Sequence, residues 1–253
     1  MEDASSKSFR ESEKPSRIGL NPAVAWCYRM DVAALVTGGK DSALALYRAM
    51  KAGHRVKYLV TIIPRRADSW MFHYPNIRLA GLFAEAVGIP HVEAETEGLK
   101  EKELKDLKRA LEMLDVEGIV SGAVASEYQK SRIESVCRDL GLKSITPLWH
   151  EDPVKLMKEL IGLNFDIIVV GVYAYGLGWR WLGKRIDQAA LQELIELNRT
   201  LGISVVGEGG EYETLVLDAP YFRRKIKVLD AEVVWNGQSG YLKIGRAELV
   251  EKP

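Results

Sequence analysis

Residues 36–44, VTGGKDSAL, place two glycines, a lysine and two hydroxyl side chains directly after an apolar run. These residue types bind phosphate, because glycines let backbone amides approach an anion closely and a lysine adds positive charge. The spacing fits neither common phosphate loop, since a Walker loop has four residues before its Gly-Lys pair and a dinucleotide fingerprint reads GxGxxG. The stretch therefore predicts either an unusual phosphate-binding loop or a tight turn in which Asp41 or Ser42 caps a helix.

A second candidate is residues 207–214, GEGGEYET, which gather three glutamates between two apolar segments. Confined carboxylates repel one another, so such a cluster is expected to face a cation or a metal ion. The alternative is a Gly-Gly turn on a solvated edge, where the glutamates meet only water.

Two further segments combine polar or aromatic side chains with glycine. Residues 174–187, AYGLGWRWLGKRID, interleave aromatics with glycines and basic residues, which favours either a ligand-facing loop or core packing. Residues 121–134, SGAVASEYQKSRIE, place Ser126, Tyr128, Gln129 and Arg132 where a helix is expected to follow a strand. That pattern fits a ligand site or an ordinary helix start with a charged face.

The elements that must position these groups alternate between strand and helix. Apolar runs predict strands at residues 31–36, 56–63, 91–95, 118–123 and 144–148, and continuous apolar runs are typical of parallel strands buried on both faces. Helices are expected between them, the first with Ala43, Leu44, Tyr47 and Met50 on its apolar face. The predicted fold is α/β, with a doubly wound, parallel, five-stranded sheet covered by helices on both faces.

The pattern changes after residue 147 and predicts a second, smaller, mixed α+β domain. Helices are expected near 153–162 and 187–201, a buried strand at 165–173, and strand-like segments at 203–218, 225–235 and 241–250. The predicted domains are residues 30–147 and 148–253. Residues 1–29 form a polar tract whose composition predicts a disordered extension.

Composition excludes several classes of protein. The chain has 253 residues, 47% of them hydrophobic, and Lys+Arg equals Asp+Glu at 35 each. Zero net charge argues against stable, sequence-independent binding to nucleic acid or anionic membrane. Two cysteines provide neither a disulfide framework nor a four-ligand zinc site, which favours a reducing cytoplasmic location. The apolar runs are too short to span a bilayer, and the oligomeric state, including a homo-oligomer, stays open.

The stretch VTGGKDSALA resembles the SGGxDS loop of the N-type ATP pyrophosphatases, the PP-loop superfamily with an adenine nucleotide alpha-hydrolase (HUP-like) fold. The resemblance implies that ATP is split between its α and β phosphates, with Mg²⁺ as its counterion and Asp41 as the candidate metal partner. It also implies catalytic roles for Lys40, Asp41 and Ser42. The residues it implies for ATP and pyrophosphate binding are Thr37, Gly38, Gly39, Lys40, Asp41, Ser42, Thr61, Ile62, Ile63 and His73.

Five segments together resemble one branch of that superfamily, the diphthine–ammonia ligases (diphthamide synthases), in their compact archaeal form. They are TGGKDSALALY, MFHYPN, GAVASEYQKSRIE, GVYAYGLGWRWLG and EGGEYETLVLD, and the last is the most specific. The chain departs from the branch at Gly178, where an acidic residue is common, and at Lys184, where arginine is usual. Both departures lie in residues 174–187 and concern the role of that segment alone.

The resemblance implies adenylation of the carboxylate of diphthine on translation elongation factor 2, followed by attack of ammonia to form diphthamide. Ammonia is expected to come free from solution. Because diphthine carries a trimethylammonium group, the glutamates and an aromatic face are expected to bind that cation. The residues implied in substrate binding are Ser126, Tyr128, Arg132, Tyr175, Gly176, Trp181, Glu208, Gly209, Gly210, Glu211, Glu213 and Thr214.

Two alternatives remain open at this stage. A PP-loop tRNA-modifying enzyme would share the loop, although thiolating members need reactive cysteines and this chain offers only Cys27 and Cys137. A non-catalytic nucleotide-binding module would share the sheet, but it would have no use for EGGEYET.

Overall fold

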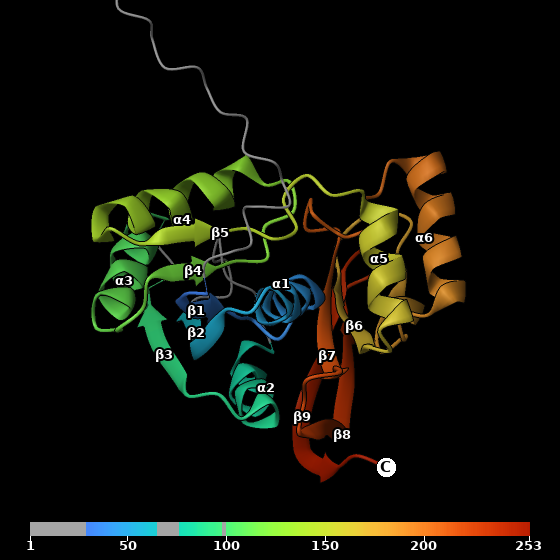
Figure 1. Cartoon of the computed structure of the whole chain (residues 1–253). Helices are drawn as coiled ribbons and strands as arrows, with labels where there is room; N and C mark the ends of the chain where they lie inside the picture. The colour runs from blue at the N-terminus through green and yellow to red at the C-terminus, as the bar shows by residue number, and fades with distance from the viewer. Residues whose placement is uncertain (1–28, 65–75, 98–99) are drawn as a thin grey trace, which may run out of the picture.

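The computed structural model describes residues 29–64, 76–97 and 100–253 (Figure 1). Its first sheet contains β1 (Asp31–Leu35), β2 (Arg55–Pro64), β3 (His91–Thr96), β4 (Gly118–Val120) and β5 (Lys143–Ile145). The strands are all parallel and lie in the order β3-β2-β1-β4-β5. The predicted five-stranded parallel sheet is therefore confirmed. Its chain order reverses beside β1, which is where open α/β sheets bind ligands.

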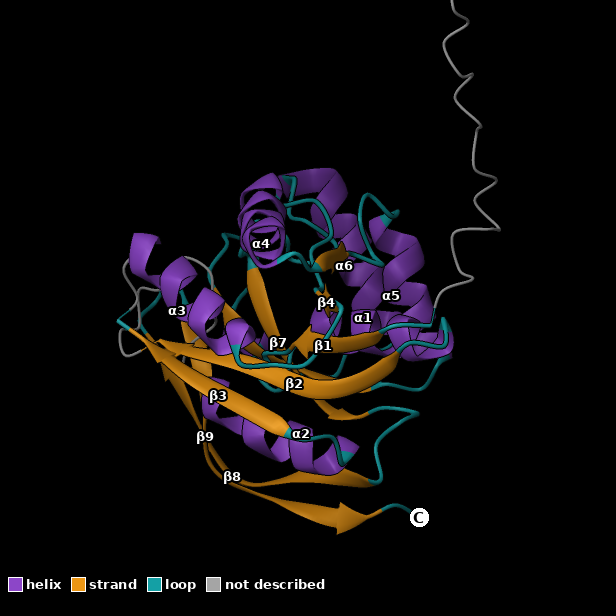
Figure 2. Ribbon diagram, turned by 60° about the vertical axis from the view of Figure 1, so that its left-hand side comes forward, coloured by secondary structure: helices purple, strands orange, loops and turns teal. Residues whose placement is uncertain are grey.

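Helices cover both faces of this sheet (Figure 2). On one side lie α1 (Lys40–Lys51) and, after the short 3₁₀ helix η2 (Ile77–Leu79), α2 (Ala80–Val87). On the other lie α3 (Lys100–Glu112) and α4 (Glu127–Leu140), which pack on a separate apolar core with Val60 and Ile119. The doubly wound arrangement is confirmed. The apolar face predicted for α1 was wrong at one position, because Met50 is 36% exposed while Leu46 and Ala49 are buried.

The second sheet is antiparallel and lies beyond α1 and α2 (Figure 1). It contains β6 (Asp166–Val172), β7 (Tyr212–Asp218), β8 (Arg224–Trp235) and β9 (Gly240–Glu251) in the order β7-β6-β9-β8. Two helices, α5 (Pro153–Gly162) and α6 (Gln188–Leu201), pack together beside β6, and the 3₁₀ helix η3 (Trp179–Trp181) follows β6. The prediction of strand structure throughout 203–218 was wrong in its first half, which forms turns up to β7.

One hydrophobic core joins the two parts of the chain. It runs from the β1 face of the first sheet through α1 and α2 to the second sheet, and its members include Leu44, Phe83, Val216 and Phe222. The rings of Phe83 in α2 and Phe222 after β7 meet edge to face with centroids 5.0 Å apart. The first sheet packs against one side of α1 and the second sheet against the other. The position of the loop that precedes α1 therefore depends on both sheets.

A charged cluster reinforces this junction from the other end of α1. The Arg48 guanidinium donates to both Glu159 carboxylate oxygens, to Glu151 and to the carbonyl oxygen of Pro147 at 2.8 Å. The Arg48 side chain is 17% exposed and the two glutamates 28–29%. Burial raises the pKa of Glu151, but hydrogen bonds and charges from Arg48 and Lys155 together lower it below its ordinary value.

No helix in the described part of the chain is long and apolar enough to cross a membrane.

The cluster predicts how Arg48 contributes to stability. Arg48→Met should lower the free energy of unfolding by about 2 kcal/mol at neutral pH, because two half-buried carboxylates lose their partner. Since the folded pKa of Glu151 is depressed, this contribution is present at neutral pH and lost as the pH falls through the carboxylate range. Urea denaturation at about pH 7 and about pH 4 measures both effects.

The exposed pair between Arg55 and Asp31 provides the control, because the Arg55 side chain is 55% exposed. Arg55→Met should cost less than about 1 kcal/mol. Equal losses in the two variants would contradict a special role for the Arg48 cluster.

Candidate functional site

The loop between β1 and α1 has the geometry of an anion cradle. Gly38 has φ +83°, a left-handed conformation that favours glycine, and Gly39 is the N-cap of α1. Neither Asp41 nor Ser42 caps the helix, since no side chain makes a capping hydrogen bond and both residues lie inside it. The alternative of a tight turn capped by one of them was therefore wrong. A helix N-terminus without a side-chain cap can bind an anion through its first backbone amides.

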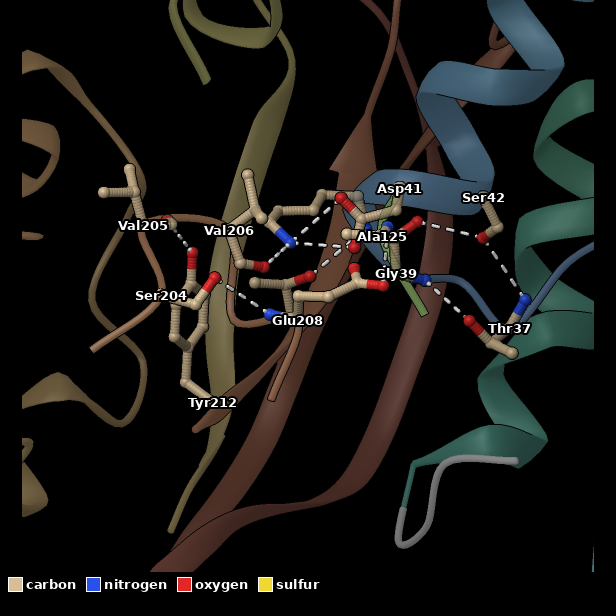
Figure 3. Close-up of polar contacts among 12 residues, drawn as sticks. Thr37, Gly39, Asp41, Ser42, Ala125, Ser204, Val205, Val206, Glu208 and Tyr212 are labelled. Atoms are coloured by element: carbon tan, nitrogen blue, oxygen red, sulfur yellow. Dashed lines mark hydrogen bonds and ion pairs between the residues drawn. The ribbon is translucent and has the colours of Figure 1, made fainter. Parts of the chain in front are cut away.

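Inside the loop, hydroxyl groups hold the backbone loosely (Figure 3). The Thr37 amide donates to Ser42 Oγ and the Gly39 amide to Thr37 Oγ1, both at 3.4 Å, while Ser42 Oγ donates to the Gly39 carbonyl at 3.0 Å. Bonds of 3.4 Å are long and therefore weak. Phosphate oxygens could replace the hydroxyl oxygens as acceptors with little loss of free energy. The loop is therefore suited to an anion.

Strand β7 binds directly to this loop. The Thr214 hydroxyl accepts a hydrogen bond from the Lys40 amide at 3.1 Å, and the Val216 amide donates to the Gly38 carbonyl at 2.8 Å. The two motifs, about 170 residues apart in sequence, thus share hydrogen bonds across the junction of the two sheets.

Lys40 is buried, with 3% of its surface exposed. Its ammonium donates to the Asp41 carboxylate oxygens at 3.0 and 2.8 Å and also to the Val206 carbonyl (Figure 3). The nitrogen lies 5.4 Å from the centroid of the Tyr212 ring. A buried charge requires such partners, so the lysine fastens the loop to the turn before β7.

The three glutamates of the turn have separate environments. Glu208 Oε1 accepts from the amides of Ala125 at 2.9 Å and Ser126 at 2.6 Å, at the start of α4. Glu211 Oε1 accepts from the Ser204 amide at 2.9 Å. Backbone amides therefore hold one oxygen of each of these two carboxylates, while Glu211 Oε2 is buried without a hydrogen-bond partner among the described residues. That the cluster faces a cation stays a prediction.

Glu213 is the glutamate that pairs with an aromatic hydroxyl. It follows Tyr212 into β7, lines the cavity described below, and hydrogen-bonds the phenol of Tyr173. Burial, and next the negative charge of Glu213, raise the pKa of Tyr173 above its ordinary value. The phenol therefore keeps its proton and donates to the carboxylate.

A cavity of about 500 Å³ lies between the loop, the turn before β7 and the start of α4. One part is apolar, lined by Leu35, Val60, Ile62 and Ile133. The other part is polar, lined by the β1–α1 loop and the turn. A cavity with an apolar end and a phosphate-type end suits a nucleotide.

Most of the sequence-predicted site residues line this cavity. They are Thr37, Gly39, Lys40, Asp41, Ser42, Ile62, Ser126, Tyr128, Glu208, Gly209, Gly210, Glu213 and Thr214. The described residues that were predicted but lie outside its lining are Gly38, Thr61, Ile63, Arg132, Tyr175, Gly176, Trp181 and Glu211. His73 lies outside the described residues. The ligand roles of all these residues stay predictions.

Strand alternation and packing explain why some of the predicted residues do not line the cavity. Thr61 points away from the cavity and donates to the Val36 carbonyl at 2.8 Å, whereas its neighbour Ile62 faces the cavity. Trp181 is 7% exposed and belongs to the core, and Tyr175 is 89% exposed. The loop between β6 and α6 therefore contributes mostly packing and surface, although its first residue, Tyr173, lines the cavity.

Sequence reasoning missed several lining residues that carry little chemical signal. Val206 contributes a carbonyl, and Ser121 ends a strand too short to show periodicity. Gly122 packs against the loop, since a Cβ there would lie 2.6 Å from the Ser42 amide nitrogen. A glycine directly after a buried strand was the one available clue to that close approach.

The described residues indicate neither a resident metal centre nor cysteine chemistry. Within residues 29–64, 76–97 and 100–253, no three His, Cys, Asp or Glu side chains are placed to hold a metal ion. Burial, and next the charge of Glu134, raise the pKa of Cys137 to about 11, so its thiol stays protonated at neutral pH. Cys27 lies outside the described residues.

Comparison with known proteins identifies relatives over nearly the whole chain. The family model for the diphthamide synthase N-terminal domain matches residues 30–144, and that for the diphthamide synthase C-terminal domain matches residues 152–250. A Homo sapiens protein named diphthine–ammonia ligase is 35% identical over 245 residues, covering 88% of this chain and 91% of its own.

Two further similarities differ in how much of the other protein they cover. The protein of that name from Schizosaccharomyces pombe is 35% identical over 246 residues, covering 88% of this chain and 40% of its own. A solved structure described as a predicted subunit of tRNA methyltransferase from Methanocaldococcus jannaschii covers 76% of this chain, at 21% identity and a TM-score of 0.43. At this TM-score and identity, the similarity supports no inference about this chain.

The link between β7 and the loop can be tested at Thr214. Thr214→Val removes the acceptor of the Lys40 amide, so the loop should lose its fixed position and ATP should bind about tenfold more weakly. Thr214→Ser keeps the hydroxyl and should bind ATP as the unaltered chain does. Isothermal titration calorimetry measures both affinities, and equal affinity in the valine variant would show that the link does not position the loop.

Proposed function

The chain belongs to the diphthamide synthase family, and we propose that it is a carbon–nitrogen ligase that converts diphthine on translation elongation factor 2 to diphthamide. ATP would be the activating substrate and ammonia the nitrogen donor. The products would be diphthamide, AMP and pyrophosphate.

One observation supports this proposal beyond the family match. The phosphate-type loop and the turn that carries EGGEYET line the same cavity and are hydrogen-bonded through Thr214 and Val216. A reaction that joins ATP to a second substrate needs both bound side by side, because positioning supplies much of the rate. A nucleotide-binding module alone would not need the second motif there.

The proposed chemistry needs little acid–base help from the protein. A carboxylate oxygen of diphthine attacks the α-phosphorus, the bond to the bridging oxygen of pyrophosphate breaks, and an acyl-adenylate forms. Ammonia nitrogen then attacks the acyl carbon, the bond from that carbon to AMP breaks, and the nitrogen loses a proton. The loop amides, Thr37 and Ser42 would bind the departing pyrophosphate and stabilise its charge.

Magnesium fits this site only as the partner of the nucleotide. Asp41 is the carboxylate of the loop, and Lys40 already donates to both of its oxygens. Mg²⁺ commonly binds one or two carboxylates together with substrate phosphates, and it supplies charge neutralisation there. Asp41 would serve as that carboxylate, with Lys40 holding its position.

The trimethylammonium group of diphthine would lie against Glu213 and Tyr173. Glu208 and Glu213 both line the cavity, but Glu208 Oε1 is already bound to two backbone amides, and Glu211 lies outside the lining. The ring of Tyr173 is 42% exposed and also lines the cavity. A carboxylate beside an aromatic face is a common site for a quaternary ammonium ion.

A turnover assay tests the proposed function. The protein is mixed with diphthine-bearing elongation factor 2, ATP, Mg²⁺ and ammonium, and mass spectrometry follows conversion of the carboxylate to the amide. We expect conversion with one AMP released per amide formed. The double variant Asp41→Ala, Ser42→Ala should lower the rate more than about 100-fold, because it removes charge and hydrogen bonds that act on the phosphates. Absence of conversion by the unaltered protein would overturn the proposal.

The cation site makes a separate prediction. Glu213→Gln keeps the shape but removes the charge, so KM for the diphthine-bearing factor should rise about tenfold while the Kd for ATP stays unchanged. Glu208→Gln is the matched control, because Glu208 binds amides at the start of α4. An unchanged KM in Glu213→Gln would place the cation elsewhere.

A further inference from the structure

Ser121 carries a buried hydroxyl for which the described residues provide no hydrogen-bond partner. The residue is 3% exposed, its Oγ is fully buried, and it lines the candidate cavity directly after β4. Its backbone is well held, because its amide donates to the Ile145 carbonyl at 2.9 Å. Buried hydroxyls are nearly always hydrogen-bonded, and this one belongs to a residue that lines a cavity in which a ligand can supply the partner.

The register of the first sheet defines what surrounds this hydroxyl. Val120 pairs with Ala34, so Ser121 stands beside Leu35, and Leu35 pairs with Val60. The three side chains therefore form one row across β4, β1 and β2, and all three line the cavity. Strand alternation puts this row on the face that packs against α3 and α4.

The opposite wall carries polar as well as apolar side chains of α4, among them Tyr128 and Gln129. Ile133 of α4 closes the cavity over the row, and Ile62 extends it along β2. The hydroxyl of Ser121 is thus the polar group of the strand row, beside the glycine-rich loop that is proposed to receive the phosphates. A largely apolar slot with a donor–acceptor on its wall suits a planar heteroaromatic ring with polar edge atoms.

We infer that Ser121 is a specificity residue for the nucleotide and that its hydroxyl hydrogen-bonds the purine base of ATP in this slot. The hydroxyl can donate to a ring nitrogen or accept from an exocyclic amino group. The inference rests on the proposed use of ATP. It adds a contact from the end of β4 to the ATP-binding residues that the family resemblance implies on β2.

Ser121→Ala tests the inference without adding bulk to the cavity. Calorimetry should show about a fivefold to tenfold weaker Kd for ATP, the effect of one neutral hydrogen bond to a buried partner. The Kd for inorganic pyrophosphate should stay unchanged, because pyrophosphate occupies only the loop. Weakening of both ligands by the same factor would mean that the change acts through Gly122 on the loop, and would overturn the inference.

Ser144 supplies a matched control. Its Oγ is also buried with no partner among the described residues, but Ser144 lies on β5 outside the cavity lining. Ser144→Ala should leave both affinities unchanged. Thermal melting of the two variants should give Tm values close to that of the unaltered chain, which excludes misfolding as the cause.

A second ligand separates a contact with the base from one with the sugar. Ser121→Ala should weaken 2′-deoxy-ATP by the same factor as ATP, since the base is unchanged. Unaltered affinity for 2′-deoxy-ATP would assign the contact to the 2′-hydroxyl and overturn the base assignment. Because these measurements need no diphthine, failure of the ligase assay with a normal Ser121 effect would refute the proposed function alone.

Discussion

The buried ammonium of Lys40 is the interaction on which the arrangement of the site depends. A charge with 3% of its residue exposed must be compensated within the protein, and Asp41, the Val206 carbonyl and the Tyr212 ring compensate it. One partner belongs to α1 and the other two flank the turn before β7. The lysine can therefore be buried only when the β1–α1 loop and the turn before β7 lie together. The folded conformation of each of these two segments thus depends on the other.

The same constraint explains the chemistry of the turn before β7. Gly207 and Gly210 have φ of +72° and +78°, which lets the chain fold back so that Tyr212 donates to the Val205 carbonyl at 2.6 Å. Glu208 then reaches the first amides of α4, where a carboxylate is favoured by the helix dipole. The motif thus contains two glutamates that accept hydrogen bonds from backbone amides and one that pairs with the Tyr173 phenol, although all three look alike in sequence.

The sequence predicted the parts of the fold that local patterns control. Continuous apolar runs located the five parallel strands, and glycines with hydroxyls located the loop after β1. It misassigned Val205 and Val206 to a strand, because apolar residues that anchor a turn look like strand residues without tertiary information. It also could not tell that Ile62 rather than Thr61 faces the cavity, since a strand buried on both faces has no alternating pattern.

The position of α1 links the fold to the proposed reaction. In an isolated doubly wound sheet, the helix after the first strand would have one solvated side, but here the second sheet covers it and β7 binds its loop. Any displacement of β7 would move the Thr214 hydroxyl and the Lys40 amide together. The proposed ligand beside Glu213 on β7 and the proposed anion in the loop would therefore act on the same few hydrogen bonds. Such shared contacts would couple the binding of the two ligands without a large movement of either sheet, because each ligand would stabilise the geometry that the other requires.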